Sequence, residues 1–280
     1  MSAPATSPRR LHVVGVCHQL QPDAFAAKLQ KLASRHGVTL RGVVVCNNTQ
    51  HAWRPLQREV EVLRGSNRLL DYSGYFEGLD HLLARHPEAV DDNVLFVNDT
   101  LVTKQAAACI LGRVLGLGSL LLQLQVPAMS GKLHPYRSIC LRNPWSGLPG
   151  YITTFCFMLN ARAVPSLREL TAQAAADDVF AQAELADDAW GRRMPPLFRE
   201  HIRAHLSYAG SPYLWPSATE RNADMLRRKA SCVYFEGRLS GAIASAGALV
   251  PINAGPRSQA ELYLHEVATR VLRPLFGRWR

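Results

Sequence analysis

The stretch NVLFVNDTL (residues 93–101) runs from four consecutive apolar residues directly into an amide, a carboxylate and a hydroxyl. A short, unbroken apolar run predicts a strand that is buried on both faces. The polar triplet follows where that strand ends, and ligands of open α/β sheets bind at the carboxyl ends of the strands. The stretch therefore predicts that Asp99 faces a ligand. Capping of a helix expected to begin near Lys104 is the other explanation of the same triplet.

The chain before this stretch alternates strands and helices. LHVVGVCHQ (11–19) and VTLRGVVVCNN (38–48) predict strands, while PDAFAAKLQKLASRHG (22–37) predicts a helix. A second helix is expected to end before Pro87. This order predicts an α/β fold, in which a mostly parallel sheet is flanked by helices on both faces.

Polar residues follow three of the predicted strands. The carboxyl ends of parallel strands meet at one edge of a sheet, so these residues are expected to lie near one another and near a ligand. They are His18, Asn47, Asn98 and Asp99.

The composition is that of a globular protein with a sizeable core. Of the 280 residues, 48% are hydrophobic and 19% are charged, and no repeat or long low-complexity segment is present. The six cysteines are far apart and mostly within apolar runs, which predicts buried free thiols in a reducing cytoplasm. The apolar segment 109–126 contains an arginine and three glycines, so it predicts a buried helix followed by a strand rather than a membrane span.

The net charge of +10, with a pI near 9.6, indicates a negatively charged partner. Nucleic acid, anionic lipid and sugar nucleotides all qualify. The final residues YLHEVATRVLRPLFGRWR (263–280) interleave apolar residues with four arginines. This segment predicts either a terminal helix packed on the body or a basic amphipathic helix at a membrane surface, and Pro274 argues against one unbroken helix.

Three short segments resemble the bacterial polysaccharide glycosyltransferases of the rhamnan synthesis protein F-like family, within the GT-A superfamily. They are DYSGYFEGL (71–79), NVLFVNDTL (93–101) and VYFEGRLSGAIASAG (233–247). The resemblance extends over roughly residues 11–250, but only in short, separated segments. The matching residues are Asp71, Gly74, Tyr75, Gly78, Leu79, Asn98, Asp99, Thr100, Glu236, Leu239, Ser240 and Gly247.

This resemblance implies a GT-A-like, Rossmann-like sheet that binds a nucleotide-sugar donor at its polar edge. It places a divalent cation, Mn²⁺ or Mg²⁺, at Asp99. The sequence has no second acid at the position of the family's DXD motif, so Lys104 or Arg113 is the alternative neutraliser of the donor diphosphate. The donor-binding candidates are Asp71, Gly74, Gly78, Asn98 and Asp99, which the resemblance implies, together with His18 and Asn47, which follow predicted strands.

Candidate acceptor and base residues lie in the second half. In RNPWSGLPGYITTFCFMLNARAV (142–164), Trp145 and Tyr151 are candidates to stack on an acceptor sugar, or else they are core or lid aromatics. The segment DDVFAQAELADDAWG (177–191) reads as helical. Within it Asp187 or Asp188, beside Trp190, is the first choice for the catalytic base, because an aromatic neighbour would exclude water from a carboxyl group. Glu236 is the second choice.

We therefore expect a single large domain that transfers sugar from a nucleotide donor to a cell-surface glycan or lipid-linked glycan. The expected parts are a flexible leader (1–10), a nucleotide-sugar half (11–126), an acceptor half (127–250) and a basic amphipathic tail (251–280). The expected location is the cytoplasm, with peripheral association at the inner membrane as an option.

Rival functions remain. The basic run ADMLRRKASC (223–232) suggests a nucleic-acid binder, but no known nucleic-acid module pattern is present, so no specific nucleic acid is expected. A dinucleotide enzyme is disfavoured, because the first strand lacks a following GxGxxG. A non-catalytic nucleotide-binding protein is the remaining alternative.

Overall fold

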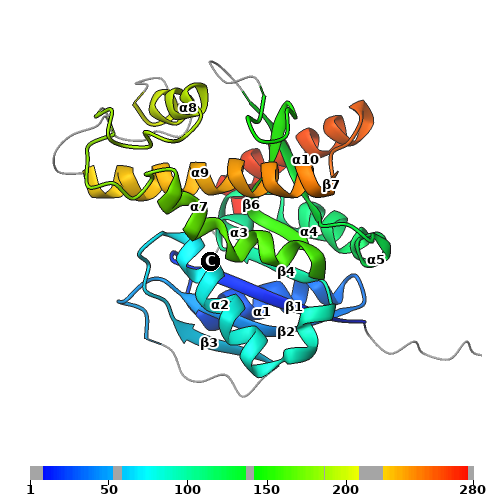
Figure 1. The fold of residues 1–280 in the computed structure, drawn as a ribbon. Coiled ribbons are helices and arrows are strands. Elements are labelled where there is room, and N and C mark those ends of the chain that lie inside the picture. The colour runs from blue at the N-terminus through cyan, green and yellow to red at the C-terminus, as the bar shows by residue number, and fades with distance from the viewer. Residues whose placement is uncertain (1–8, 53–58, 137–141, 186, 208–222, 277–280) are drawn as a thin grey trace, which may run out of the picture.

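The structure is a computed structural model that describes residues 9–52, 59–136, 142–185, 187–207 and 223–276. Within these residues, seven strands form one sheet in the order β3-β2-β1-β4-β6-β5-β7 (Figure 1). The strands are β1 (Arg9–Cys17), β2 (Val38–Cys46), β3 (Val60–Arg64), β4 (Val94–Asn98), β5 (Ala128–Pro135), β6 (Gly150–Leu159) and β7 (Ala248–Pro251).

The helices cover both faces of this sheet. In the first half they are α1 (Pro22–Ser34), α2 (Asp71–Arg85), η1 (Pro87–Asp91), α3 (Thr100–Lys104), α4 (Ala107–Gly116) and α5 (Gly118–Gln123). In the second half they are η2 (Ala161–Ala163), α6 (Val164–Arg168), α7 (Leu170–Ala176), α8 (Pro196–Ser207), α9 (Ala223–Ala246) and α10 (Pro256–Phe276).

The predicted mostly parallel α/β architecture is confirmed. Strands β1 to β4 pair in parallel, and β6 runs antiparallel to both of its neighbours, β4 and β5. The chain leaves β1 towards β2 and β3 on one side and returns on the other side as β4. The boundary between β1 and β4 is thus a topological switch point, where ligands of open α/β sheets bind.

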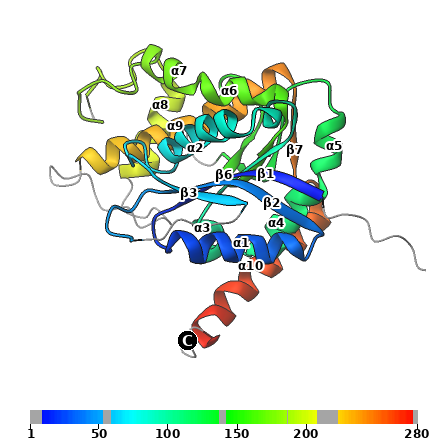
Figure 2. The same cartoon turned by 90° about the horizontal axis from the view of Figure 1, so that it is seen from below.

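Both faces of the sheet are buried, as the unbroken apolar strands predict. In β1, Val14 and Val16 belong to the core beneath α2 and α9, while Val13 and Cys17 belong to the core beneath α1 and α4. Figure 2 shows these two helical layers on opposite sides of the strands. Because successive side chains of a strand point to opposite faces of the sheet, each buried strand contributes to two separate cores.

Helix α2 packs closely on strand β1, and two glycines permit this. A Cβ atom on Gly74 would lie 2.7 Å from Val16 Cγ2, and one on Gly78 would lie 2.5 Å from Val14 Cγ1. Both glycines are buried against β1. The structure therefore corrects the expectation that they bind the donor: they allow helix–sheet packing instead.

Gly78→Ala should lower the free energy of unfolding by about 1–3 kcal/mol, because the added methyl group overpacks a closed core. Gly116→Ala is the matched control: Gly116 also lies in a helix, but a Cβ atom there meets nothing within 4 Å. The control should be neutral or stabilising by up to about 1 kcal/mol. Urea unfolding of the two variants measures both values, and equal effects would contradict the packing role of Gly78.

Several boundaries differ from the sequence expectations. Strand β1 begins at Arg9, so the last two residues of the expected leader are in the sheet, and residues 1–8 lie outside the described residues. Segment 109–126 contains parts of two helices, and the next strand begins at Ala128. Helix α10 continues through Pro274 to Phe276, so the expected break there is wrong.

The expected helix over 177–191 is also wrong. Helix α7 ends at Ala176, and Asp178 adopts a left-handed backbone conformation with φ of 59°. A non-glycine residue in this region does not continue a right-handed helix. Turns follow, and they bury Trp190, whose indole N–H donates to the Val179 carbonyl oxygen at 3.1 Å.

The cysteines agree with the sequence expectation where they are described. Cys17, Cys46, Cys156 and Cys232 are buried, Cys109 is partly buried, and all five are free thiols. Cys140 lies outside the described residues.

Candidate functional site

Asp99 holds the loop that follows β1. Its Oδ2 atom accepts hydrogen bonds from the backbone N–H groups of His18, Gln19 and Leu20 at 2.9, 2.6 and 3.1 Å. Asp99 occupies the N-cap position of α3, but its side chain makes no capping hydrogen bond. The carboxylate therefore joins the carboxyl ends of β1 and β4 across the switch point, a role that neither local explanation of the triplet predicted.

Asp71 and Asn98 meet at the same edge, as the resemblance implied. The Asn98 Nδ2 atom donates to Asp71 Oδ2 at 2.7 Å, and Asn98 Oδ1 accepts from the Thr100 N–H at 3.1 Å. Asn98 is buried, whereas Asp71 at the start of α2 is partly exposed. Asn98 is thus fixed at both ends and orients the carboxyl group of Asp71.

The backbone directly before Asp71 is strained. Leu70 has φ of 52° and ψ of −130°, a conformation that costs a leucine about 1–3 kcal/mol. Its carbonyl oxygen accepts from Asn47 Nδ2 at 2.7 Å and from Ser73 Oγ at 2.8 Å. Asn47 is buried. The side-chain amide of Asn47 therefore holds this loop in place, whereas the sequence predicted that Asn47 contacts the donor.

Glu236 approaches the edge from α9. Its Oε1 atom accepts from the backbone N–H of Thr154 at 3.1 Å and from Thr154 Oγ1 at 2.8 Å. Thr154 lies on β6, and its carbonyl oxygen accepts from the hydroxyl of Tyr75 in α2 at 2.6 Å. Glu236 is thus tied to the sheet, while Arg227 and Arg228 contact Asp224.

These groups influence one another electrostatically. Burial, together with smaller contributions from the nearby carboxylates of Asp99 and Glu236, raises the pKa of Asp71 from 3.8 to about 6. The ammonium group of Lys229 and the hydrogen bond from Asn98 oppose this rise. Asp71 is therefore a carboxyl group that changes protonation close to neutral pH, a property that is enriched at functional sites.

Asp187 and Asp188 do not have the environment expected of a shielded base. Both residues are exposed, and the side chain of Asp188 is 90% exposed. Asp187 Oδ1 accepts from the Ala189 N–H at 2.8 Å, while Asp188 contacts Arg199 and Arg203 at 3.9 and 3.8 Å. Because Trp190 turns into the core, it does not exclude water from either carboxylate.

The two candidate acceptor aromatics are both partly buried. The ring of Trp145 packs edge-on against Phe198 and Tyr234, and the Arg238 guanidinium lies 4.9 Å from its centroid. Tyr151 is in strand β6 rather than in the preceding loop, and its ring lies 5.2 Å from that of Tyr136. Both aromatics thus pack within the second half, and acceptor contact remains a prediction.

The residues expected to hold Mn²⁺ or Mg²⁺ do not fit such an ion. The Asp99 oxygen that accepts three N–H groups faces positive dipole ends, which repel a cation, and Asp99 is 4% exposed. Within the described ranges, no group of three or more His, Cys, Asp or Glu side chains is arranged to hold a metal ion. Arg113, the alternative neutraliser, contacts Glu261 and two carbonyl oxygens near α10 instead.

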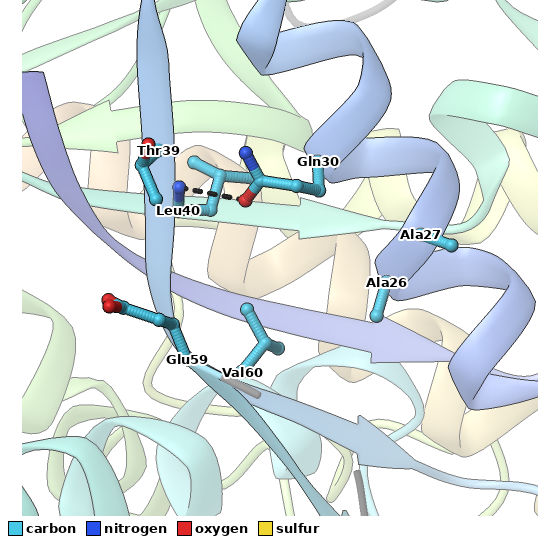
Figure 3. A pocket seen from close by; sticks show the side chains of 7 residues that line it. All are labelled: Ala26, Ala27, Gln30, Thr39, Leu40, Glu59 and Val60. Atoms are coloured by element: carbon cyan, nitrogen blue, oxygen red, sulfur yellow. Dashed lines mark hydrogen bonds between the residues drawn. The ribbon is translucent and has the colours of Figure 1, made fainter. Parts of the chain in front are cut away.

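A pocket of about 240 Å³ lies elsewhere, between α1 and the amino-terminal ends of β2 and β3 (Figure 3). Gln30 crosses it to accept a hydrogen bond from the Leu40 N–H at 3.0 Å. None of the expected site residues lines it, and the carboxyl ends of the strands are at the opposite edge. The pocket is lined by Ala26, Ala27, Gln30, Thr39, Leu40, Glu59 and Val60.

Three features of the edge escaped the sequence patterns. In the sequence, Lys229 stands out only as one member of the basic run 223–232, and Thr154 carries no motif of its own. The strain at Leu70 has no local sequence signal, because leucine is not a residue that favours positive φ. His18, by contrast, is exposed at the edge, where its position after the strand predicts it.

No protein-family model, no curated protein and no solved structure matches the chain.

Proposed function

We propose that the protein is a glycosyltransferase of the GT-A type, which transfers sugar from a nucleotide donor to a glycan acceptor. One observation carries the proposal. Four segments that are far apart in sequence, three of which supplied the resemblance, bring polar side chains to one edge of the sheet. Those side chains are Asp71, Asn98, Thr154 and Glu236.

The chemistry of sugar transfer fits these groups. An inverting transfer needs a carboxylate that accepts the proton of the acceptor hydroxyl, and a base is most effective when its pKa lies near the working pH. Asp71, with a pKa raised to about 6, meets this requirement better than the exposed Asp187 or Asp188. We therefore assign the base to Asp71, with Glu236 as a second carboxylate held in place by Thr154.

The leaving diphosphate needs positive charge. Lys229 is close enough to Asp71 to lower its pKa, so it lies near the proposed donor site. An ammonium group at that place would stabilise the charge that develops on the departing phosphate. In this proposal the ammonium group of Lys229 takes the role that a metal ion would have, because Asp99 does not fit a metal ion.

A panel of nucleotide sugars tests the proposal, with release of nucleoside diphosphate as the readout. Glu236→Gln should lower turnover about tenfold to a hundredfold, because it removes a charge held at the reacting edge. Asp188→Asn removes the same charge from an exposed position and should leave turnover unchanged. Equal losses in both variants, or no release from any donor by the wild-type protein, would contradict the proposal.

A further inference from the structure

One side of helix α10 is attached to the body. Leu262 is buried, and the Arg113 guanidinium donates to Glu261 Oε2 at 2.9 Å. The ammonium group of Lys132 pairs with Glu266. Glu261 and Glu266 are the only acidic residues after position 252. Both carboxylates of this segment therefore pair with cations of the body, and Glu261 pairs in addition with Arg257 of the same helix.

The opposite side of α10 is apolar and exposed. Tyr263, Leu264 and Val267 are 66%, 65% and 37% exposed. Residues three and four apart share one face of a helix, so these side chains form one apolar strip, which we call the outward strip. Figure 2 shows α10 extending away from the helices that cover the sheet. In the sequence, Val271 and Leu275 continue the four-residue spacing from Val267.

The sequence that contains the outward strip is rich in arginine. Five arginines occur from position 257 onward: Arg257, Arg270, Arg273, Arg278 and Arg280. The side chain of Arg257 is 93% exposed, and it pairs with Glu261 of the same helix at 3.1 Å. An exposed apolar strip with basic residues on the same helix is typical of helices that lie in the interface of an anionic membrane.

We propose that the outward strip of α10 docks this protein on an anionic lipid bilayer, with the helix lying in the plane of the surface. In the part of the chain that the structure describes, no helix is long and apolar enough to cross a membrane. Pairing with the same helix of a second copy would bring two sets of arginines together, which like-charge repulsion opposes. The proposal does not depend on the sugar-transfer reaction.

Flotation with vesicles of phosphatidylcholine, with and without phosphatidylglycerol, tests the proposal on the full chain. Wild-type protein should bind the anionic vesicles and not the neutral ones. Leu264→Glu should weaken this binding at least about tenfold, because a side chain that the bilayer would bury changes from apolar to charged. Leu197→Glu in α8 is the matched control, since Leu197 is also 65% exposed and the charge change is identical. The control should bind like wild type.

Three results would overturn the proposal. The first is absence of wild-type binding to anionic vesicles, and the second is equal weakening by Leu264→Glu and Leu197→Glu, which would indicate charge attraction alone. The third is a wild-type dimer in sedimentation velocity that Leu264→Glu dissociates, which would assign the outward strip to a second copy. Thermal melts of both variants should match wild type, because both leucines are on the surface.

Discussion

Asp99→Ala should lower the free energy of unfolding by about 3 kcal/mol or more, because three backbone N–H groups lose their charged acceptor. The loop after β1 would lose its attachment to the end of β4, so nucleotide binding should fall with stability. Asp99→Asn keeps one acceptor oxygen without the charge and should lie between wild type and Asp99→Ala. Urea unfolding monitored by circular dichroism measures all three proteins.

Asp80→Ala is the control for this series. Asp80 is on the surface and pairs with Arg168 at 3.2 Å, and an exposed ion pair of this kind contributes about 0–1 kcal/mol. If Asp99→Ala is no more destabilising than Asp80→Ala, then Asp99 does not stabilise the protein by holding the loop after β1.

Asp71→Asn should change stability and activity in opposite directions. The pKa of Asp71 is raised from 3.8 to about 6, so its stabilising contribution is complete below pH 3.8 and is lost as the pH rises through 6. The total loss is about 3 kcal/mol. Asparagine does not ionise and still offers an oxygen to Asn98. The variant should therefore be more stable than wild type at pH 8, with the difference shrinking towards pH 4.

The same substitution should reduce turnover at least about a hundredfold, because asparagine cannot accept the acceptor proton. In the wild-type protein, kcat/KM should rise as the pH increases through about 6 and Asp71 loses its proton. Asp80→Asn, at an exposed position, should change neither turnover nor kcat/KM. Lower stability of Asp71→Asn at pH 8, or undiminished turnover, would show that Asp71 is not the base.

The sequence was sufficient for those parts of the fold that depend on local pattern. Apolar runs identified β1, β2 and β4, which are buried on both faces. Strand β3 was missed, because VEVLR is a five-residue strand that carries charges and pairs only with β2 among the described strands. The helix expected at 177–191 failed because the left-handed Asp178 ends the helical run, and propensity does not reveal a single such residue.

The site was predictable in its location but not in its roles. Strand ends and the family resemblance placed Asp71, Asn98 and Asp99 at one edge of the sheet. The hydrogen bonds of Asp99, however, join residues about 80 positions apart, and no local pattern encodes such a contact. Likewise, the sequence does not show that Gly74 and Gly78 allow α2 to pack on the sheet, because the same glycines could equally allow a ligand to approach.

Calorimetric titration with UDP, GDP, CDP and TDP at physiological salt tests the central claim most directly, namely that the carboxyl edge of the sheet binds the donor nucleotide. At least one nucleotide should bind with a stoichiometry of about one per chain. Lys229→Met should weaken it about tenfold or more, whereas Lys28→Met, at an exposed position in α1, should not. The account would be contradicted if no nucleotide binds, if both variants behave alike, or if DNA binds sequence-selectively under the same conditions.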